Sequence, residues 1–168
     1  MPLLVLTLIC LVVSGALALM NSVTHPIIIS AAAERADAAM INKIPHATGF
    51  EPVELDAFEG IPHTVKEAYR TTNEVGYIFI AAINGFSGDI TIMCGVDMEG
   101  RIIRTSTLSH TETKGIGTII EQEAFLGTFS GKDDRLEGVD TVTGATISTR
   151  AYMDAIMDIL EAVEVIRD

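Results

Sequence analysis

Short runs of apolar residues, several of them alternating with polar ones, predict a β-sheet in the middle of the chain. The predicted strands span residues 52–55, 64–70, 76–82, 89–96 and 101–108. Ile90, Ile92 and Cys94 fall on one face of the fourth strand, so we expect Cys94 to be a small buried hydrophobic residue. Gly100 ends a hairpin loop at 97–100, where a positive φ is expected. Consecutive strands without intervening helices favour an antiparallel sheet over a dinucleotide-binding α/β unit.

Two later segments have the spacing of amphipathic helices. Residues 118–129 carry an incomplete apolar stripe. Residues 148–166 space apolar side chains, from Tyr152 onwards, at helical intervals and place acidic residues on the other face. An exposed turn at 131–134 separates the two segments. Together with the strands, these segments predict an α+β fold in which helices pack on an antiparallel sheet.

The N-terminal stretch has a different character. Residues 2–20 are almost all aliphatic, and no formally charged side chain occurs before Glu34. This run is long enough to span a bilayer. A cleaved signal peptide and a buried core helix are the alternatives, but the basic residues typical of a signal peptide do not precede the run. We therefore expect an uncleaved transmembrane anchor at 1–25, a linking helix at 26–44 and a globular domain at 45–168.

The composition narrows the choice of partners and cofactors. The 168 residues carry a formal net charge of −12, with a pI near 4.6. This charge argues against a nucleic-acid partner, since nucleic acids attract basic surfaces. Cys10 and Cys94 lie far apart, and neither belongs to a Cys-x-x-Cys pair. The chain alone is therefore not expected to build an iron–sulfur, zinc or other metal site.

The most distinctive stretch, at 140–149, has the sequence Asp-Thr-Val-Thr-Gly-Ala-Thr-Ile-Ser-Thr. It holds five hydroxyl side chains and a glycine directly before the predicted C-terminal helix. The free N–H groups and the positive dipole end of a helix start favour a phosphate. Gly144 and Ala145 would let the backbone come close to it. The alternative is a hydroxyl-rich helix cap that binds no ligand.

This stretch resembles the D-x-x-[ST]-G-A-T-x-[ST] flavinylation motif of the FMN-binding domain family. The family is shared by the G subunit of Rnf electron-transport complexes and the C subunit of the sodium-pumping NADH:quinone reductase. The resemblance implies that the FMN phosphate is esterified to Thr146, and that Ser148 or Thr149 caps the helix. The motif residues assigned to the cofactor site are Asp140, Thr143, Gly144, Ala145, Thr146 and Ser148.

A second segment, 109–117, contains two glycines two residues apart and alone would indicate a solvated turn. It follows Gly85-Phe86-Ser87-Gly88 and the hairpin in the order of the family's G-F-x-G, d-x-x-G-x-I and h-x-E-T-P-G-L-G segments. The resemblance implies that this loop faces the isoalloxazine ring, and the residues so assigned are His110, Glu112, Thr113, Gly115 and Gly117. Lys114 stands where the family usually has Pro. We expect its side chain to point into water rather than to stabilise a reduced flavin.

The resemblance covers nearly the whole chain and implies a membrane-anchored electron-transfer subunit that is not catalytic alone. FMN on Thr146 would relay electrons within a ferredoxin:NAD⁺ oxidoreductase that pumps Na⁺ or H⁺. No histidine lies near Thr146 in the sequence to activate its hydroxyl, so attachment is expected to need a separate flavin transferase. The alternatives are the C subunit of a sodium-translocating NADH:quinone reductase and an unflavinylated membrane-anchored binding domain.

The charge pattern and the family resemblance imply opposite orientations in the membrane. Arg35 and Lys43 follow the apolar run and no basic residue precedes it, which by the positive-inside rule places the domain in the cytoplasm. The family instead exposes its flavin domain on the outer face of the cell (inner) membrane, in the periplasm or outside the cell. Following the family, we expect a single-pass protein in the lipid bilayer, with other membrane and peripheral Rnf subunits as its partners.

Overall fold

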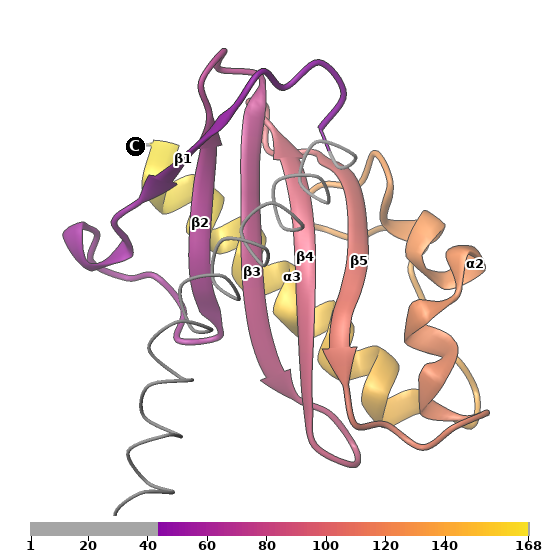
Figure 1. Cartoon of the computed structure of the whole chain (residues 1–168). Helices are drawn as coiled ribbons and strands as arrows, with labels where there is room; N and C mark the ends of the chain where they lie inside the picture. The colour runs from indigo at the N-terminus through magenta and orange to yellow at the C-terminus, as the bar shows by residue number, and fades with distance from the viewer. Residues whose placement is uncertain (1–43, 168) are drawn as a thin grey trace, which may run out of the picture. The chain divides into compact units, whose positions relative to one another are not determined.

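A five-stranded antiparallel sheet is the central element of the computed structural model, which describes residues 44–167 (Figure 1). The strands follow one another across the sheet in chain order, and each pairs with its sequence neighbours. They are β1 (Phe50–Val53), β2 (Val65–Thr71), β3 (Gly76–Asn84), β4 (Asp89–Asp97) and β5 (Ile102–His110). The predicted antiparallel sheet is thus confirmed.

The predicted strand boundaries differ from the observed ones by one or two residues. β1 begins and ends two residues earlier than predicted, and β3 and β5 each extend two residues further. The predicted hairpin loop lies between β4 and β5, and Gly100 has the expected positive φ, +85°. The Asp97 carboxylate stabilises this turn by accepting the N–H groups of Glu99 and Arg101, at 3.0 and 2.7 Å.

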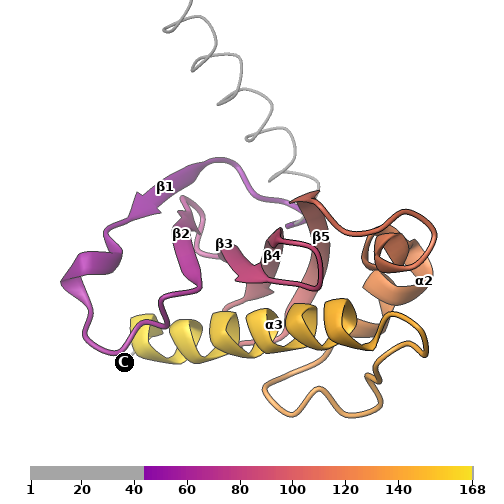
Figure 2. The same ribbon diagram turned by 90° about the horizontal axis from the view of Figure 1, so that it is seen from below.

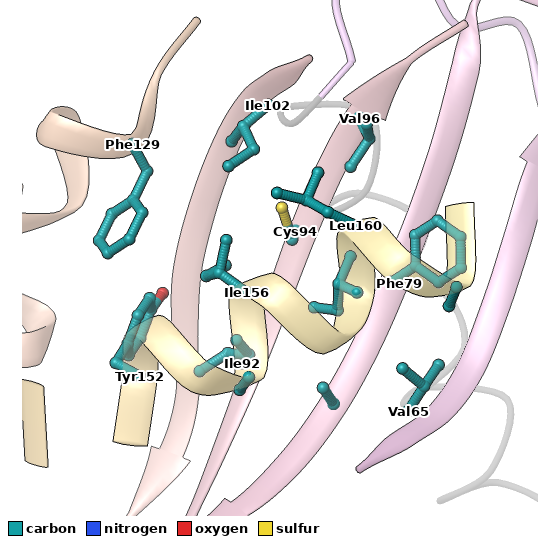
Figure 3. Close-up of a cluster of buried hydrophobic side chains, with 14 of the residues drawn as sticks. Val65, Phe79, Ile92, Cys94, Val96, Ile102, Phe129, Tyr152, Ile156 and Leu160 are labelled. Atoms are coloured by element: carbon teal, nitrogen blue, oxygen red, sulfur yellow. The ribbon is translucent and has the colours of Figure 1, made fainter. Parts of the chain in front are cut away.

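A 22-residue helix, α3 (Thr146–Arg167), packs across one face of the sheet (Figure 2). Its apolar side chains meet those that alternate along the strands. Ile90, Ile92 and Cys94 are fully buried in this core, so the predictions for the fourth strand and for Cys94 are confirmed. Figure 3 shows Ile156 and Leu160 of the helix among the strand residues. This packing fixes the position of the helix relative to the sheet.

An aromatic cluster lies near the beginning of the helix. The ring of Tyr152 packs against Phe125 and Phe129, with ring centroids 5.4 and 5.5 Å away. The Tyr152 hydroxyl shares a 2.6 Å hydrogen bond with Thr105 Oγ1. Burial raises the pKa of Tyr152 well above its ordinary value, because the phenolate would lose its hydration. The phenol is therefore a neutral, hydrogen-bonded part of the core.

The prediction of a single helix at 118–129 is wrong. The segment forms three short elements, the 3₁₀ turns η2 (Gly117–Glu121) and η3 (Gly127–Phe129) with α2 (Glu123–Leu126) between them. Gln122 has an extended backbone that separates η2 from α2. The Ile120 carbonyl, moreover, accepts a 2.6 Å hydrogen bond from Thr107 Oγ1 of β5. The incomplete apolar stripe reflects this interruption, and Phe125 and Phe129 still reach the core.

The predicted transmembrane anchor at 1–25 and nearly all of the predicted linking helix at 26–44 lie outside the described residues. Within residues 44–167, no helix is both long enough and apolar enough to cross a membrane. A further 3₁₀ turn, η1 (Leu55–Ala57), connects β1 to β2.

Candidate functional site

A cavity of about 340 Å³ lies where α3 begins. Three segments that are far apart in the sequence form its walls: the turn between β3 and β4, the loop after β5, and the start of α3. We call this cavity the slot. The residues that line it are Phe86, Glu112, Thr113, Ile116, Gly117, Gly144, Ala145, Thr146, Ile147 and Ser148.

Large apolar side chains line the slot and are open to solvent. Phe86 is 66% exposed, Ile116 55% and Ile147 57%, and among the described residues only Leu108 and Met157 are other large hydrophobic side chains so exposed. An apolar cleft of this kind is typical of a ligand site. Phe86, Ile116 and Ile147 were not among the residues predicted from the sequence. The available signal was a large apolar residue beside a glycine, as in Gly85-Phe86 and Ile116-Gly117.

Thr146 is the first residue of α3, and its exposed side chain lines the slot. The helix thus begins two residues earlier than predicted. Gly144 turns the chain into the helix with φ +88°, a value that favours glycine, and the Ala145 N–H donates to the Val142 carbonyl at 3.0 Å. The Thr146 hydroxyl makes a 3.4 Å contact with the same carbonyl. It is therefore held by a weak contact and remains accessible to a reagent.

The prediction that Ser148 or Thr149 caps α3 is wrong, because both lie inside the helix. Thr149 is buried; its hydroxyl donates to the Ala145 carbonyl at 2.9 Å and accepts the Val142 N–H at 3.2 Å. These bonds fasten the 142–145 turn to the first turn of the helix. The Thr149 hydroxyl therefore fixes the backbone that carries Thr146.

The Glu112 carboxylate lies in the wall of the slot and is only 6% exposed. One oxygen accepts the backbone N–H of Ser87 at 2.9 Å, and the other accepts the hydroxyl of Ser148. Gly85 and Gly117 leave room for it: a side chain at Gly117 would place its Cβ 2.6 Å from the Glu112 Cβ, and one at Gly85 would collide with the carboxylate. This residue connects all three walls of the slot.

His110 and Gly115, both predicted to face the flavin ring, do not line the slot. His110 Nδ1 accepts the Glu112 N–H at 3.0 Å, while Nε2 lies 3.0 Å from a carboxylate oxygen of Glu121. It therefore holds the Glu112 backbone through this hydrogen bond. Gly115 forms an exposed turn with φ +82°. Lys114 is exposed, as expected.

The remaining predicted residues divide between the slot and a neighbouring hollow. Thr113 lines the slot, and its hydroxyl lies 3.3 Å from that of Ser87. Asp140 and Thr143 instead line a hollow next to Phe125 and Thr128. The slot therefore brings together Gly144, Ala145, Thr146 and Ser148 of the motif with Glu112, Thr113 and Gly117 of the loop.

Two other features of the described residues bear on ligand binding. No group of three or more His, Cys, Asp or Glu side chains in 44–167 could hold a metal ion. A larger cavity, of about 640 Å³, is lined by residues between 52 and 69 and contains none of the predicted site residues. The slot is thus a cavity that brings residues of both predicted segments together.

Residues 85–161 match the family model of the FMN-binding domain, a range that includes all three walls of the slot. The chain is 31% identical over 136 residues to the G subunit of the ion-translocating oxidoreductase complex of Methanosarcina acetivorans, covering 74% of this chain and 72% of that one. It is 26% identical over 106 residues to the G subunit of the proton-translocating ferredoxin:NAD(+) oxidoreductase complex of Clostridium ljungdahlii, covering 57% of each chain.

The matched part is shorter for some relatives. The G subunit of the ion-translocating oxidoreductase complex of Shewanella amazonensis is 35% identical over 89 residues, which cover 45% of this chain and 41% of that one. The chain thus spans about half the length of several curated relatives. Among solved structures, NqrC of Shewanella oneidensis superposes with a TM-score of 0.53 and 17% identity, over 75% of this chain and 82% of that one, which shows a shared fold. The chain, whose residues 85–161 match the FMN-binding domain, belongs to the family of G subunits of Rnf-type ion-translocating oxidoreductase complexes.

Proposed function

We propose that this chain is the membrane-anchored electron-transfer subunit of an Rnf-type complex and carries FMN as a phosphoester on Thr146. The observation that carries the proposal is the position of Thr146: an exposed hydroxyl at the first residue of α3, on the wall of a largely apolar slot. FMN supplies the electron-transfer chemistry when it is bound. The chain's own residues hold the ring and bind the phosphate.

The slot suits a flat aromatic ring with polar edges. Its volume of about 340 Å³ lies at the lower end of the range of small-molecule sites, on the order of 300–1,000 Å³. Phe86, Ile116 and Ile147 offer apolar surface to the ring faces. Glu112 and Thr113 supply polar groups on the same wall. This combination of apolar faces and a few polar groups is that of a cofactor site.

The start of α3 suits the phosphate. The first N–H groups of a helix have no partner within it, and the first N–H here that bonds backward belongs to Thr149, 2.9 Å from the Ala145 carbonyl. Arg150 is exposed one turn after Thr146, and both residues line another hollow, which also includes Asn84. A phosphoester on Thr146 would therefore meet free N–H groups, the positive end of the helix dipole and a guanidinium.

Attachment would replace the phosphoanhydride bond of FAD with a phosphoester bond to Thr146. The Thr146 Oγ would attack the FMN phosphorus of FAD, the diphosphate P–O bond would break, and AMP would leave. The hydroxyl proton needs a base, and within 44–167 no histidine or carboxylate is hydrogen-bonded to Thr146 Oγ. We infer that a separate flavin transferase supplies the base. The chain contributes an accessible hydroxyl on a rigid turn.

The remaining parts of the proposal concern the setting. A transmembrane anchor at 1–25 would hold the domain, residues 45–168, on the outer face of the cell membrane. Other Rnf subunits would deliver and accept the electrons that pass through FMN. Digestion of intact cells or spheroplasts with an external protease should clip the domain. Protection of the domain would place it in the cytoplasm instead.

The covalent bond can be tested on a denaturing gel viewed under ultraviolet light, using the full chain expressed together with the transferase. The wild type should give a fluorescent band, and Thr146→Val should give none because the ester oxygen is lost. Thr141→Val removes a hydroxyl from the same stretch and is the matched control. It should remain fluorescent.

Two results would contradict the proposal. A wild-type band without fluorescence would leave an unflavinylated binding domain as the better account. Fluorescence of Thr146→Val would mean that the flavin is attached elsewhere. Proteins that copurify with the chain distinguish an Rnf complex from a sodium-translocating NADH:quinone reductase.

A further inference from the structure

We propose that Glu112 is a positioning residue that holds the slot in shape and makes reduction of its flavin less favourable through its charge. The inference rests on the proposed function, since it concerns a flavin carried on Thr146. It goes further in assigning to one buried carboxylate both the geometry of the slot and part of its redox tuning.

The geometric role follows from what the carboxylate joins. It accepts the Ser87 N–H at 2.9 Å from the turn between β3 and β4, and the Ser148 hydroxyl from the first turn of α3. Ser148 lies two residues after Thr146. The carboxylate therefore links the turn that carries Phe86 to the helix turn that carries the attachment site, although these segments are about 60 residues apart in the chain. Within residues 44–167, no backbone hydrogen bond connects these two segments directly.

The surroundings of Glu112 are also built around its side chain. Gly85 and Gly117 lie so close that a side chain at either position would collide with it. Its backbone N–H is held by His110 Nδ1 at 3.0 Å. Because the backbone and both carboxylate oxygens are fixed, the side chain has little freedom to turn away. The Glu112 side chain thus holds the walls of the slot in fixed positions.

The electrostatic role follows from the partners of the carboxylate. Both of its donors, a backbone N–H and a serine hydroxyl, are neutral. The ion pairs among the described residues are Arg70–Glu74 and His110–Glu121. No Lys or Arg nitrogen therefore lies within 4.0 Å of the Glu112 carboxylate. A buried negative charge without a cation is screened weakly. A flavin in the slot therefore accepts an electron against the repulsion of this charge.

Two substitutions separate the roles. Glu112→Gln keeps the shape and can keep both hydrogen bonds, because its amide oxygen accepts the Ser87 N–H and its NH₂ donates to Ser148 Oγ. We expect flavin attachment as in the wild type and a midpoint potential shifted to a more positive value. Glu112→Ala removes both hydrogen bonds of the carboxylate. Attachment per folded molecule should fall by about tenfold or more, because misplacing a reacting group by about 1 Å can cost on the order of 100-fold in rate.

The measurements use the full chain expressed with the transferase: in-gel flavin fluorescence per folded protein, and the midpoint potential by reductive titration. Glu123→Gln, which removes an exposed carboxylate at the start of α2, is the matched control and should change neither. Ser148→Ala removes the hydrogen bond between Ser148 and Glu112. This variant serves as the test if Glu112→Ala fails to fold. It should also lower attachment.

A measurement without flavin tests the positioning role of Glu112 by itself. In a Thr146→Val background, Glu112→Ala should speed hydrogen exchange of the Ser87 amide, whereas Glu112→Gln should leave it protected. Unchanged Ser87 protection, or wild-type attachment in Glu112→Ala, would overturn the positioning role. A potential in Glu112→Gln equal to or below that of the wild type would overturn the electrostatic role. A wild type without covalent flavin would instead overturn the proposed function, and this inference with it.

Discussion

The middle and the start of α3 are held in place by different forces. In the middle, Ile156 and Ile159 are completely buried in the core, and burial of such a side chain contributes about 1.5–3 kcal/mol. At the start, the contacts are hydrogen bonds of Ser148 and Thr149, two of the few buried polar residues in the described part of the chain. The apolar residue between this turn's hydroxyls, Ile147, is exposed.

This difference separates stability from positioning. Apolar packing tolerates substitutions that preserve volume and polarity, because the hydrophobic effect has no direction. Hydrogen bonds between buried groups depend on distance and angle, and the loss of one partner leaves the other unsatisfied. We therefore expect changes in the middle of α3 to alter stability without altering flavin attachment. Changes at its start should alter attachment.

The largest effect on stability is expected from Ile156→Ala. Deleting this buried side chain should lower the free energy of unfolding by about 2–5 kcal/mol, measured by urea titration. Flavin attachment per folded molecule should not change. Met157→Ala, at a partly exposed neighbouring position, is the control and should have a much smaller effect. A parallel loss of attachment in the folded fraction of Ile156→Ala would break the distinction between the two parts of the helix.

An intermediate effect is expected from Thr149→Val. This change keeps the shape of the side chain but leaves the buried turn without its hydroxyl partner, which should cost about 1–3 kcal/mol. Attachment at Thr146 should also fall, because the turn that carries it is released. Thr149→Ser restores the hydroxyl and should recover most of the attachment. If Thr149→Val is flavinylated like the wild type, attachment does not depend on the hydrogen bonds of the Thr149 hydroxyl.

The strands and the core could be predicted from local patterns, because the alternation of apolar and polar residues along a strand decides which side chains face the core. The alternation of Ile90, Ile92 and Cys94 correctly identified the face that meets α3. The helix predicted at 118–129 was wrong: the incomplete apolar stripe did not show that Gln122 is extended or that the Ile120 carbonyl bonds Thr107 of β5. Local rules describe a segment well when the segment's own pattern decides its structure.

The candidate site was predicted in part, since the motif residues Gly144 to Thr146 do line a cavity. The partner of Ser148 could not be predicted, because Glu112 lies 36 residues away and their contact depends on the packing of α3 on the sheet. Ser148 was expected to cap the helix because the helix was predicted to begin at residue 148, whereas it begins at Thr146. His110, which was predicted to face the ring, does not line the slot, and its Nδ1 accepts the Glu112 N–H.

The smallest effect is expected from Tyr152→Phe at the border between the two parts of α3. Loss of the hydroxyl that bonds Thr105 should cost about 1 kcal/mol and leave attachment unchanged. Burial raises the pKa of Tyr152, so its contribution to stability is fully present below the pKa of an unfolded tyrosine, about 10. It is lost as the pH rises above that value, because the unfolded chain then gains by ionising.

Thermal unfolding between about pH 8 and 11 measures this difference. The melting temperature of the wild type should fall above about pH 10 more steeply than that of Tyr152→Phe. Equal slopes would mean that the buried phenol does not contribute to the pH dependence.

The central claim, that Thr146 carries FMN, is tested most directly by peptide mass spectrometry of the full chain purified from cells that contain the transferase. Cleavage after Arg135 and Arg150 releases residues 136–150, which contain all five hydroxyl groups of the motif stretch. We predict that this peptide is heavier by the mass of FMN less one water, and that fragmentation places the added mass on Thr146. An unmodified peptide, or FMN on another hydroxyl, would contradict the account.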